Sequence, residues 1–236
     1  MIKALTLALV LGTGAAACSS PVGKSREELG RRGFEFSEKA FFQQVRAGRT
    51  DIVKLYLAAG ISPDAQDLGF TPLLEAARRG FSETALALIK SGADVNAKDP
   101  YGVTAVMFCL IAGSKDVALE LIGKGADVDS RDVDGRTALV EALTSENEIP
   151  PEVIETLVQT GADVNVRLAG GLTPLMLAAS GDPRVVRILV EAGADVKARD
   201  ENGVGVLERA MGRPEAFRIL EEAQAALPAV KKGVNP

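Results

Sequence analysis

The sequence predicts an all-α fold, built as an array of repeated two-helix units. The tetrapeptide Gly-Ala-Asp-Val recurs along the chain, and so does the element Gly-x-Thr. The tetrapeptide begins at Gly92, Gly125, Gly161 and Gly193, and the Gly-x-Thr element begins at Gly69, Gly102, Gly135 and Gly171. Successive intervals are 33, 36 and 32 residues for the tetrapeptide and 33, 33 and 36 for Gly-x-Thr. A period near 33 residues indicates stacked repeats, in which each unit buries its apolar face against its neighbours.

The composition agrees with thin helical layers and excludes several classes of function. Of the 236 residues, 47% are hydrophobic and only 4% are aromatic, with no tryptophan, so small aliphatic side chains must form the core. The chain has 27 basic and 32 acidic residues and no long basic block, which argues against nucleic acid as a partner. Histidine is absent, which removes the commonest general base and the commonest zinc ligand.

Residues 1–17 have the features of a secretory signal peptide. Lys3 supplies a positive charge, residues 4–11 are apolar, and small residues lead up to Ala17. The apolar stretch is shorter than the roughly 20 residues that a membrane-spanning helix needs. Two cleavage patterns fit this segment. Ala15 and Ala17 match simple A-x-A cleavage, whereas Cys18 directly after Ala17 resembles a bacterial lipobox, although Ala15 stands where leucine is usual.

In the lipobox interpretation, Cys18 becomes the lipidated first residue of the mature protein, and its acyl chains anchor it to a membrane. Ser19 resembles the residue that follows the cysteine in lipoproteins sorted to the outer membrane. This interpretation predicts a periplasmic protein anchored to the outer membrane, and the alternative is a soluble periplasmic protein. The polar residues 18–33 are expected to form a tether between the anchor and the folded array.

Each repeat is expected to contain two helices and an extended finger. Thr71-Pro72-Leu73 places a capping hydroxyl and a proline where a first helix begins, and residues 173–175 do the same. Gly80 is expected to end such a helix. A second helix follows with apolar residues at helical spacing, as in residues 185–190. The glycine of Gly-Ala-Asp-Val ends the second helix, and residues 96–102 are expected to form a finger with a tight turn.

This pattern resembles the ankyrin repeat, whose consensus runs D-x-x-G-x-T-P-L-H-x-A-A through to G-A-D-V-N-A. The resemblance implies an ankyrin-repeat solenoid of about six units, two of which are degenerate caps. The matching units are 66–98, 99–131, 132–167 and 168–199, with an N-terminal cap at 34–65, a C-terminal cap at 200–223 and a tail at 224–236. The family's histidine is replaced by Leu74, Met107, Val140 and Met176, so the polar link between repeats is expected to be lost.

The resemblance also implies that a protein partner binds on the concave face, formed by the fingers and the exposed side of the first helices. Apolar residues edged by arginine at these positions are typical of a protein-binding surface. The candidates are Leu68, Phe70, Tyr101, Val103, Val133 and Leu172 on fingers, Phe108, Ile111 and Leu177 on first helices, and Arg78, Arg79 and Arg136 beside them. The alternative is that half of the apolar residues pack between adjacent fingers.

Two further charged sets favour structural roles. The acidic set is Asp127, Asp129, Asp132 and Asp134, and the basic set is Lys98, Arg131, Arg167 and Arg199. The acidic set lacks the spacing of an EF-hand loop, because Arg131 stands at its fifth position, so a solvated finger turn is expected. The basic set closes successive repeats and could bind an acidic partner. Asp99, Asp132 and Asp200 directly follow three of its members, however, and are expected to neutralise them.

No catalytic constellation, metal site or cofactor site is predicted, and the chain is not expected to be an enzyme. Cys109 lies in the apolar run 106–110 without a flanking cation, which favours a buried small side chain over a reactive thiol. Glu75, Glu141 and Glu208 recur at similar repeat positions. Recurrence in separate layers favours a structural role over paired-carboxylate catalysis.

The predicted function is therefore that of a monomeric, extracytoplasmic module that binds another protein. Analogy with bacterial ankyrin proteins of the cell envelope leaves two roles open. One is an immunity protein that neutralises a toxin acting in the periplasm or on membranes. The other is an accessory scaffold for an envelope enzyme, including enzymes that handle oxidative stress.

Overall fold

The computed structural model describes residues 20–226, so Cys18, the predicted signal peptide and residues 227–236 lie outside the described part. The described chain forms two compact units, one ending at Gly125 and the other beginning at Ala126. All regular elements of residues 20–226 are helices, apart from isolated β-bridges. Every one of these helices is too short or too polar to cross a lipid bilayer.

Helix bounds follow the predicted alternation of first and second helices. The first unit contains α2 (Pro21–Arg31), α3 (Glu38–Arg46), α4 (Thr50–Ala58), α5 (Pro72–Arg78), α6 (Ser82–Lys90), α7 (Ala105–Ile111) and α8 (Lys115–Gly123). The second unit contains α9 (Ala138–Thr144), α10 (Pro151–Gln159), the short 3-10 helix η1 (Ala169–Gly171), α11 (Pro174–Ala178), α12 (Pro183–Glu191), α13 (Val206–Arg209) and α14 (Pro214–Ala226).

Threonine hydroxyls begin most of the first helices, as the sequence predicts. The Oγ1 atom of Thr71 accepts a hydrogen bond from the N–H of Leu74 at 3.3 Å, and Thr104 and Thr173 cap α7 and α11 in the same way. Thr137 at the start of α9 differs, because its Oγ1 is buried and has no hydrogen-bond partner in the described structure. The capping rule therefore holds for α5, α7 and α11 and fails at α9.

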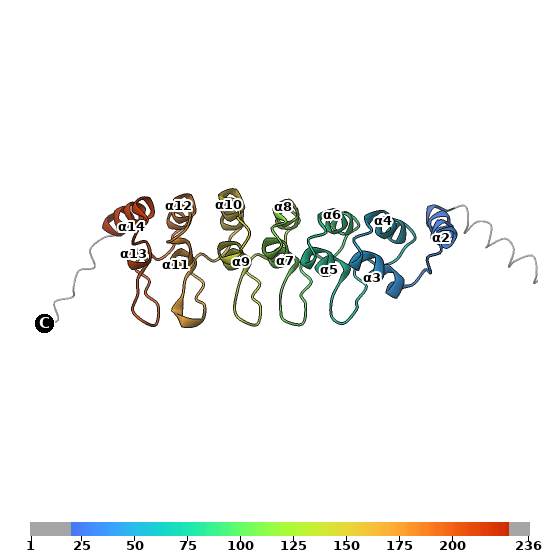
Figure 1. The fold of residues 1–236 in the computed structure, drawn as a ribbon, viewed down its shortest axis with the longest axis horizontal. Coiled ribbons are helices and arrows are strands. Elements are labelled where there is room, and N and C mark those ends of the chain that lie inside the picture. Colours follow the sequence, from blue (N-terminus) through green and yellow to red (C-terminus); the bar gives the residue numbers. More distant parts are fainter. Residues whose placement is uncertain (1–19, 227–236) are drawn as a thin grey trace, which may run out of the picture. The chain divides into compact units, whose positions relative to one another are not determined.

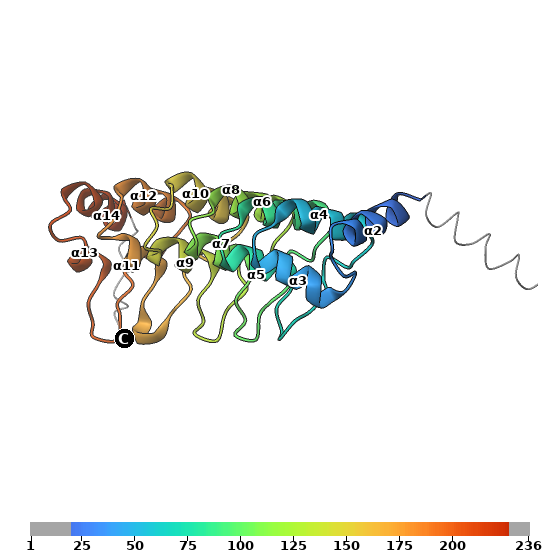
Figure 2. The same ribbon diagram turned by 45° about the vertical axis from the view of Figure 1, so that its right-hand side comes forward.

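In the first unit the helices form two rows (Figure 1). Helices α3, α5 and α7 make one row, helices α4, α6 and α8 make the other, and each packs against the next member of its row. The loops that lead into α5 and α7 project from the α3–α5–α7 row, on the side away from the other row (Figure 2). These loops are the expected fingers.

Apolar contacts hold the layers of this unit together where the family has a polar link. Leu74 and Met107, which occupy the position of the family's histidine, are completely buried. Ala76 and Ala77 are also buried, and their small side chains allow close approach of neighbouring helices. Polar contacts also join members of a row, and in one of them the hydroxyls of Thr50 and Thr84 lie 2.8 Å apart and join α4 to α6.

The second unit repeats this architecture by itself. Helices α9, α11 and α13 form one row and helices α10, α12 and α14 form the other. Val140 and Met176 are buried at the position of the family's histidine. Successive loops are joined by side chains that accept backbone N–H groups. Asp129 accepts from Asp163, and Asn165 accepts from Asp195, both at 2.8 Å.

The expected tether over residues 18–33 is wrong in its described part. Residues 21–31 form helix α2, which packs on α4 and buries Leu29 completely. The Nε atom of Arg26 donates to the carbonyl oxygen of Ala59 at 2.9 Å, and its guanidinium lies 4.3 Å from the ring centroid of Phe36. Helix α2 thus covers the N-terminal end of the first unit, which would otherwise expose apolar surface to water.

Cys109 is buried, as the sequence predicts. It is free of disulfide bonds and lies on α7 with no exposed surface. Burial in these apolar surroundings raises the pKa of the thiol to about 12, so the thiolate is disfavoured at neutral pH. The side chain therefore acts as a small hydrophobic group between layers.

The packing of α2 predicts a large cost for shortening Leu29. We expect Leu29→Ala to lower the free energy of unfolding by about 2–3 kcal/mol, because it leaves a cavity between α2 and α4. Leu86→Ala is the matched control, since Leu86 is exposed on α6 and its loss should cost less than about 1 kcal/mol. Urea unfolding followed by far-UV circular dichroism measures both. Equal and small effects would mean that α2 does not cap the array.

Candidate protein-binding surface

The finger that leads into α5 presents a leucine to solvent in a strained conformation. Asp67 and Phe70 exchange two backbone hydrogen bonds of 3.0 Å, which close a tight turn around Leu68 and Gly69. Leu68 is 85% exposed, and its φ of 53° makes it the only residue other than glycine with a positive φ in residues 20–226. The positive φ values of Leu68 and Gly69 are those that a two-residue hairpin turn requires, and the turn leaves the leucine side chain in solvent, where it can contact another molecule.

The next finger lies directly against this one. A Cβ atom added to Gly69 would lie 2.7 Å from Cγ of Pro100, so the two turns are in close contact. Tyr101 follows Pro100 and is 64% exposed. It stands 33 residues after Leu68, at the equivalent tip position. The two tips therefore present an aliphatic and an aromatic side chain in adjacent layers.

Beside the Leu68 finger, three arginines surround one buried carboxylate. Glu75 on α5 has a side chain only 3% exposed. It accepts hydrogen bonds from Arg78 at 2.9 Å and from Arg79 at 2.6 Å, and Arg46 Nε on α3 lies 3.4 Å from its Oε1. Arg46 also donates to Asp67 of the finger at 2.6 Å. We call Arg46, Arg78, Arg79, Glu75 and Asp67 the arginine cluster.

The buried carboxylate is ionised and fixes the arginines that surround it. Burial acts to raise the pKa of Glu75, but hydrogen bonds from Arg79 and Arg78 outweigh it and hold this pKa below its ordinary value. The guanidinium of Arg78 lies 5.6 Å from the ring centroid of Phe70, and that of Arg46 lies 5.6 Å from the ring of Phe42. The cluster therefore holds cationic groups on the surface in defined positions.

An apolar patch occupies the next layer. Phe108 and Ile111 on α7 stand 33 residues after Glu75 and Arg78, at the same repeat positions. Ile111 is exposed, and Phe108 and Val103 are half-buried. With Tyr101 of the finger, these side chains form the apolar patch, which replaces the charged groups of the layer before it.

The predicted candidates of the second unit form a separate set. Val133 is 70% exposed at a finger tip, and Leu172 and Leu177 are half-buried. Arg136 donates to both carboxylate oxygens of Glu141 and, at 2.5 Å, to the hydroxyl of Thr144. The hydrogen bonds to Glu141, together with the negative charges of Glu141, Asp132 and Asp134, raise the pKa of the guanidinium. Arg136 is thus occupied within its own repeat, whereas Glu75 is also approached by Arg46 from the neighbouring repeat.

Sequence reasoning missed Arg46 as part of the surface. Arg46 lies in residues 34–65, which match the repeat consensus only weakly. A signal was present, because Arg46 stands 33 residues before Arg79 and therefore at the same repeat position. The same weak match conceals Phe42, which is buried and packs against Arg46.

Two members of the basic set pair with acidic side chains, but not with the aspartates that follow the set in sequence. Asp99, Asp132 and Asp200 each accept backbone N–H groups of their own finger through Oδ1, and Asp200 also pairs with Arg209 at 2.5 Å. The basic side chains pair elsewhere. Arg131 lies 3.6 Å from Asp163, and Arg199 lies 3.0 Å from Glu208. These three aspartates therefore shape the turns of their own fingers.

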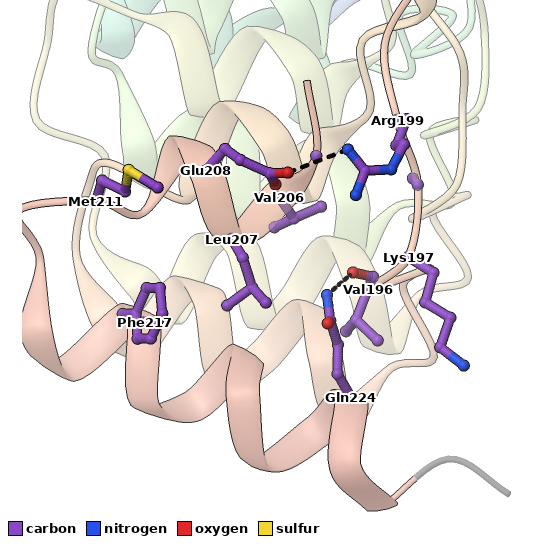
Figure 3. Close-up of a pocket in the computed structure, with 11 residues that line it drawn as sticks. Val196, Lys197, Arg199, Val206, Leu207, Glu208, Met211, Phe217 and Gln224 are labelled. Carbon is purple, nitrogen blue, oxygen red and sulfur yellow. Dashed lines mark hydrogen bonds and ion pairs between the residues drawn. The ribbon is translucent and has the colours of Figure 1, made fainter. Parts of the chain in front are cut away.

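A groove of about 540 Å³ lies on the face of the last helix pair that no other described helix covers (Figure 3). Leu207 of α13 and Phe217 of α14 line its apolar part, and Met211 at one end is exposed. At the other end, Gln224 donates to the carbonyl oxygen of Val196 at 2.6 Å. None of the predicted finger and first-helix candidates lines this groove, although Arg199 of the basic set does, so the groove is distinct from the surface described above.

Comparison with known proteins gives consistent matches. The family described as ankyrin repeats (three copies) matches in four overlapping segments, which are 41–132, 76–168, 107–200 and 150–226. A putative ankyrin repeat-containing protein of Treponema pallidum is 36% identical over 65% of this chain and 40% of its own length. An ankyrin repeat-containing protein of Schizosaccharomyces pombe is 40% identical over 26% of this chain and 30% of its own length.

A potassium channel of Oryza sativa is 48% identical over 25% of this chain. The match spans only 8% of that channel. The chain therefore covers less than half the length of each of these relatives, and the likeness concerns their repeats.

The contact between fingers predicts different costs at two glycines. Gly69 and Gly92 have φ values of +80° and +84°, so alanine at either should cost about 1 kcal/mol through backbone strain. Only at Gly69 does the new Cβ also meet Pro100, whereas nothing lies within 4 Å at Gly92. We expect Gly69→Ala to cost about 2 kcal/mol in total, measured by urea unfolding. Identical costs for the two variants would contradict the finger contact.

Proposed function

The chain belongs to the ankyrin repeat family, and from this premise we propose that it is an extracytoplasmic module that binds a protein partner through the fingers and first helices of its first unit. Ankyrin repeats indicate a protein–protein interaction module, and the family is typically non-catalytic. The fold alone does not select a surface, so the proposal depends on the site.

The exposed tip of the first finger carries this proposal. Leu68 is 85% exposed at the tip of the turn, so its side chain contributes little to the packing of the repeat. Tyr101 lies on the adjacent finger, with the apolar patch and the arginine cluster beside it. Exposed aromatic and aliphatic residues next to arginine have the composition of binding hot spots.

Membrane anchoring through Cys18 is the second part of the proposal. Its support is the lipobox-like sequence that ends in Ala17-Cys18. Helix α2 begins at Pro21, only three residues after Cys18, and it packs on α4. An acyl chain on Cys18 would therefore be joined almost directly to the capping helix of the first unit, and the partner would be met close to the membrane.

A pull-down from cell envelopes tests the proposed surface, with the chain tagged after Pro236. We expect one partner in near-stoichiometric amount. The double variant Leu68→Ser, Tyr101→Ser should capture about tenfold less, because it removes two central apolar contacts. Met211→Ser is the control, since Met211 is equally exposed but lies in the groove of the last helix pair. Equal capture by both variants would exclude the first-unit fingers.

The identity of the captured protein separates the two roles that analogy leaves open. A toxin that acts in the periplasm or on membranes would assign an immunity function. An envelope enzyme would assign an accessory scaffold.

Cell fractionation tests the anchor. We expect the wild-type protein in the membrane fraction, with acyl chains on Cys18 detected by mass spectrometry of the mature N-terminus. Cys18→Ala removes the acylated group and should move the protein to the soluble periplasmic fraction. Cys109→Ala is the control, because Cys109 is buried. An unmodified N-terminus in the wild-type protein would assign simple secretion instead.

A further inference from the structure

The chemistry of the partner can be inferred from the charges and apolar groups of the first unit. We propose that the arginine cluster and the adjacent apolar patch bind an acidic, amphipathic segment of a protein, with a carboxylate held by Arg46, Arg78 and Arg79 and an aromatic or aliphatic side chain held by Phe108 and Ile111. This inference rests on the proposed function, because it names what the first-unit surface recognises.

The arginine cluster keeps an excess of positive charge. Three guanidinium groups face two carboxylates, so one positive charge is not neutralised within the cluster. Each arginine donates one hydrogen bond to a carboxylate, and a guanidinium has several further N–H donors. The side chains are 37–43% exposed, so these donors remain accessible to a carboxylate from a partner.

The arginines are also held in place before any partner arrives. The buried carboxylate of Glu75 holds Arg78 and Arg79 by ion pairs. The ring of Phe70 packs against Arg78, and the ring of Phe42 packs against Arg46. Ordering a flexible arginine side chain on binding costs free energy, and this cost is reduced when the side chain is already fixed. A cavity of about 350 Å³ opens beside Arg46, between α3 and residues Gln66 and Asp67, and gives a partner side chain room to enter.

The register of the repeat sets the distance between the two halves of the site. Glu75 and Arg78 on α5 correspond to Phe108 and Ile111 on α7, and the two helices pack against each other. Packed helices lie about 8–10 Å apart. A carboxylate and an apolar anchor about 10 Å apart fit this spacing. They would lie about seven residues apart on a helix, or about three residues apart on an extended strand.

The pairing of Arg136 with Glu141 shows that arginine at a repeat position is not sufficient for such a site. There a single arginine meets a single carboxylate in a two-pronged pair, and no positive charge is left over. The first unit differs because two arginines, Arg78 and Arg79, share the single carboxylate of Glu75, while Arg46 from the neighbouring layer has Asp67 as a partner of its own. The excess charge therefore marks the first unit as the place where an acidic partner binds.

Selection from a random peptide library displayed on phage tests the inference with the full mature chain as bait. We expect selected peptides to be enriched in Asp or Glu at about seven or about three residues from an aromatic or aliphatic residue. A synthetic peptide of the selected sequence should bind the wild-type protein with an affinity that weakens as ionic strength rises.

Three variants locate the peptide. Glu75→Gln with Arg78→Gln and Arg79→Gln removes the buried charge together with its partners, which avoids leaving Glu75 unpaired. Arg46→Gln alone keeps Glu75 and both of its hydrogen bonds. Each should weaken peptide binding about tenfold or more, as should Phe108→Ser. Arg187→Gln is the control. It makes the same change of one unit in net charge as the triple variant, on the exposed side of α12, and should leave binding unchanged.

The outcomes separate the inference from the proposed function. Selected peptides that are not enriched in acidic residues, but need Leu68 and Tyr101 for binding, would overturn the inference. They would still support the proposed binding surface. Failure to select any peptide that distinguishes the wild-type protein from its variants would count against both. Tight binding of pyrophosphate alone, lost in the triple variant, would assign the cluster to phosphate-bearing ligands and overturn the acidic-protein partner.

Discussion

Both units depend on the burial of apolar side chains between one helix pair and the next. A single pair exposes the residues that it would bury in a stack, so each layer is stable only because its neighbours cover it. Leu74 and Met107 carry this contact in the first unit, at a position where the ankyrin family usually has a polar histidine, and both are completely buried. Because this position is apolar, an uncovered layer at the end of the array exposes more apolar surface than it would with the polar histidine. This explains why α2 closes the N-terminal end with Leu29.

The same regular register allows adjacent layers to differ in chemistry without a change in backbone. Glu75 and Phe108 occupy equivalent places on α5 and α7, yet one is a buried carboxylate that fixes arginines and the other is a half-buried aromatic ring. Repeat positions that face the fingers are therefore free to vary, while positions between layers remain apolar. Most residues that give the first unit its charged and apolar halves are therefore distinct from the apolar side chains packed between its layers, although Arg46 and Glu75 also join α3 to α5.

Much of this fold follows from the sequence, because the 33-residue period, the threonine caps and the glycine stops each have a local physical cause. What the sequence did not predict depends on contacts between distant residues. Residues 21–31 are polar apart from a few side chains, so their helix becomes apparent only when Leu29 and Arg26 are seen against α4. Asp132 was expected to neutralise Arg131, but its carboxylate binds the amides of its own finger. In the arginine cluster, spacing alone could have linked Arg46 to Arg79, but only the structure shows that both approach Glu75.

The packing of α2 also restricts how far from the membrane an anchored chain can bind a partner. A flexible tether of residues 18–33 would let the array move far from an anchor at Cys18, because an extended chain spans up to about 3.5 Å per residue. With α2 packed on α4, only residues 18–20 separate the proposed anchor from the folded unit, a reach of roughly 10 Å. An anchored first unit is then confined to the membrane surface. Since the arginine cluster and the apolar patch are both in that unit, a partner that combines acidic and apolar groups would have to be a membrane protein or a protein brought to the membrane.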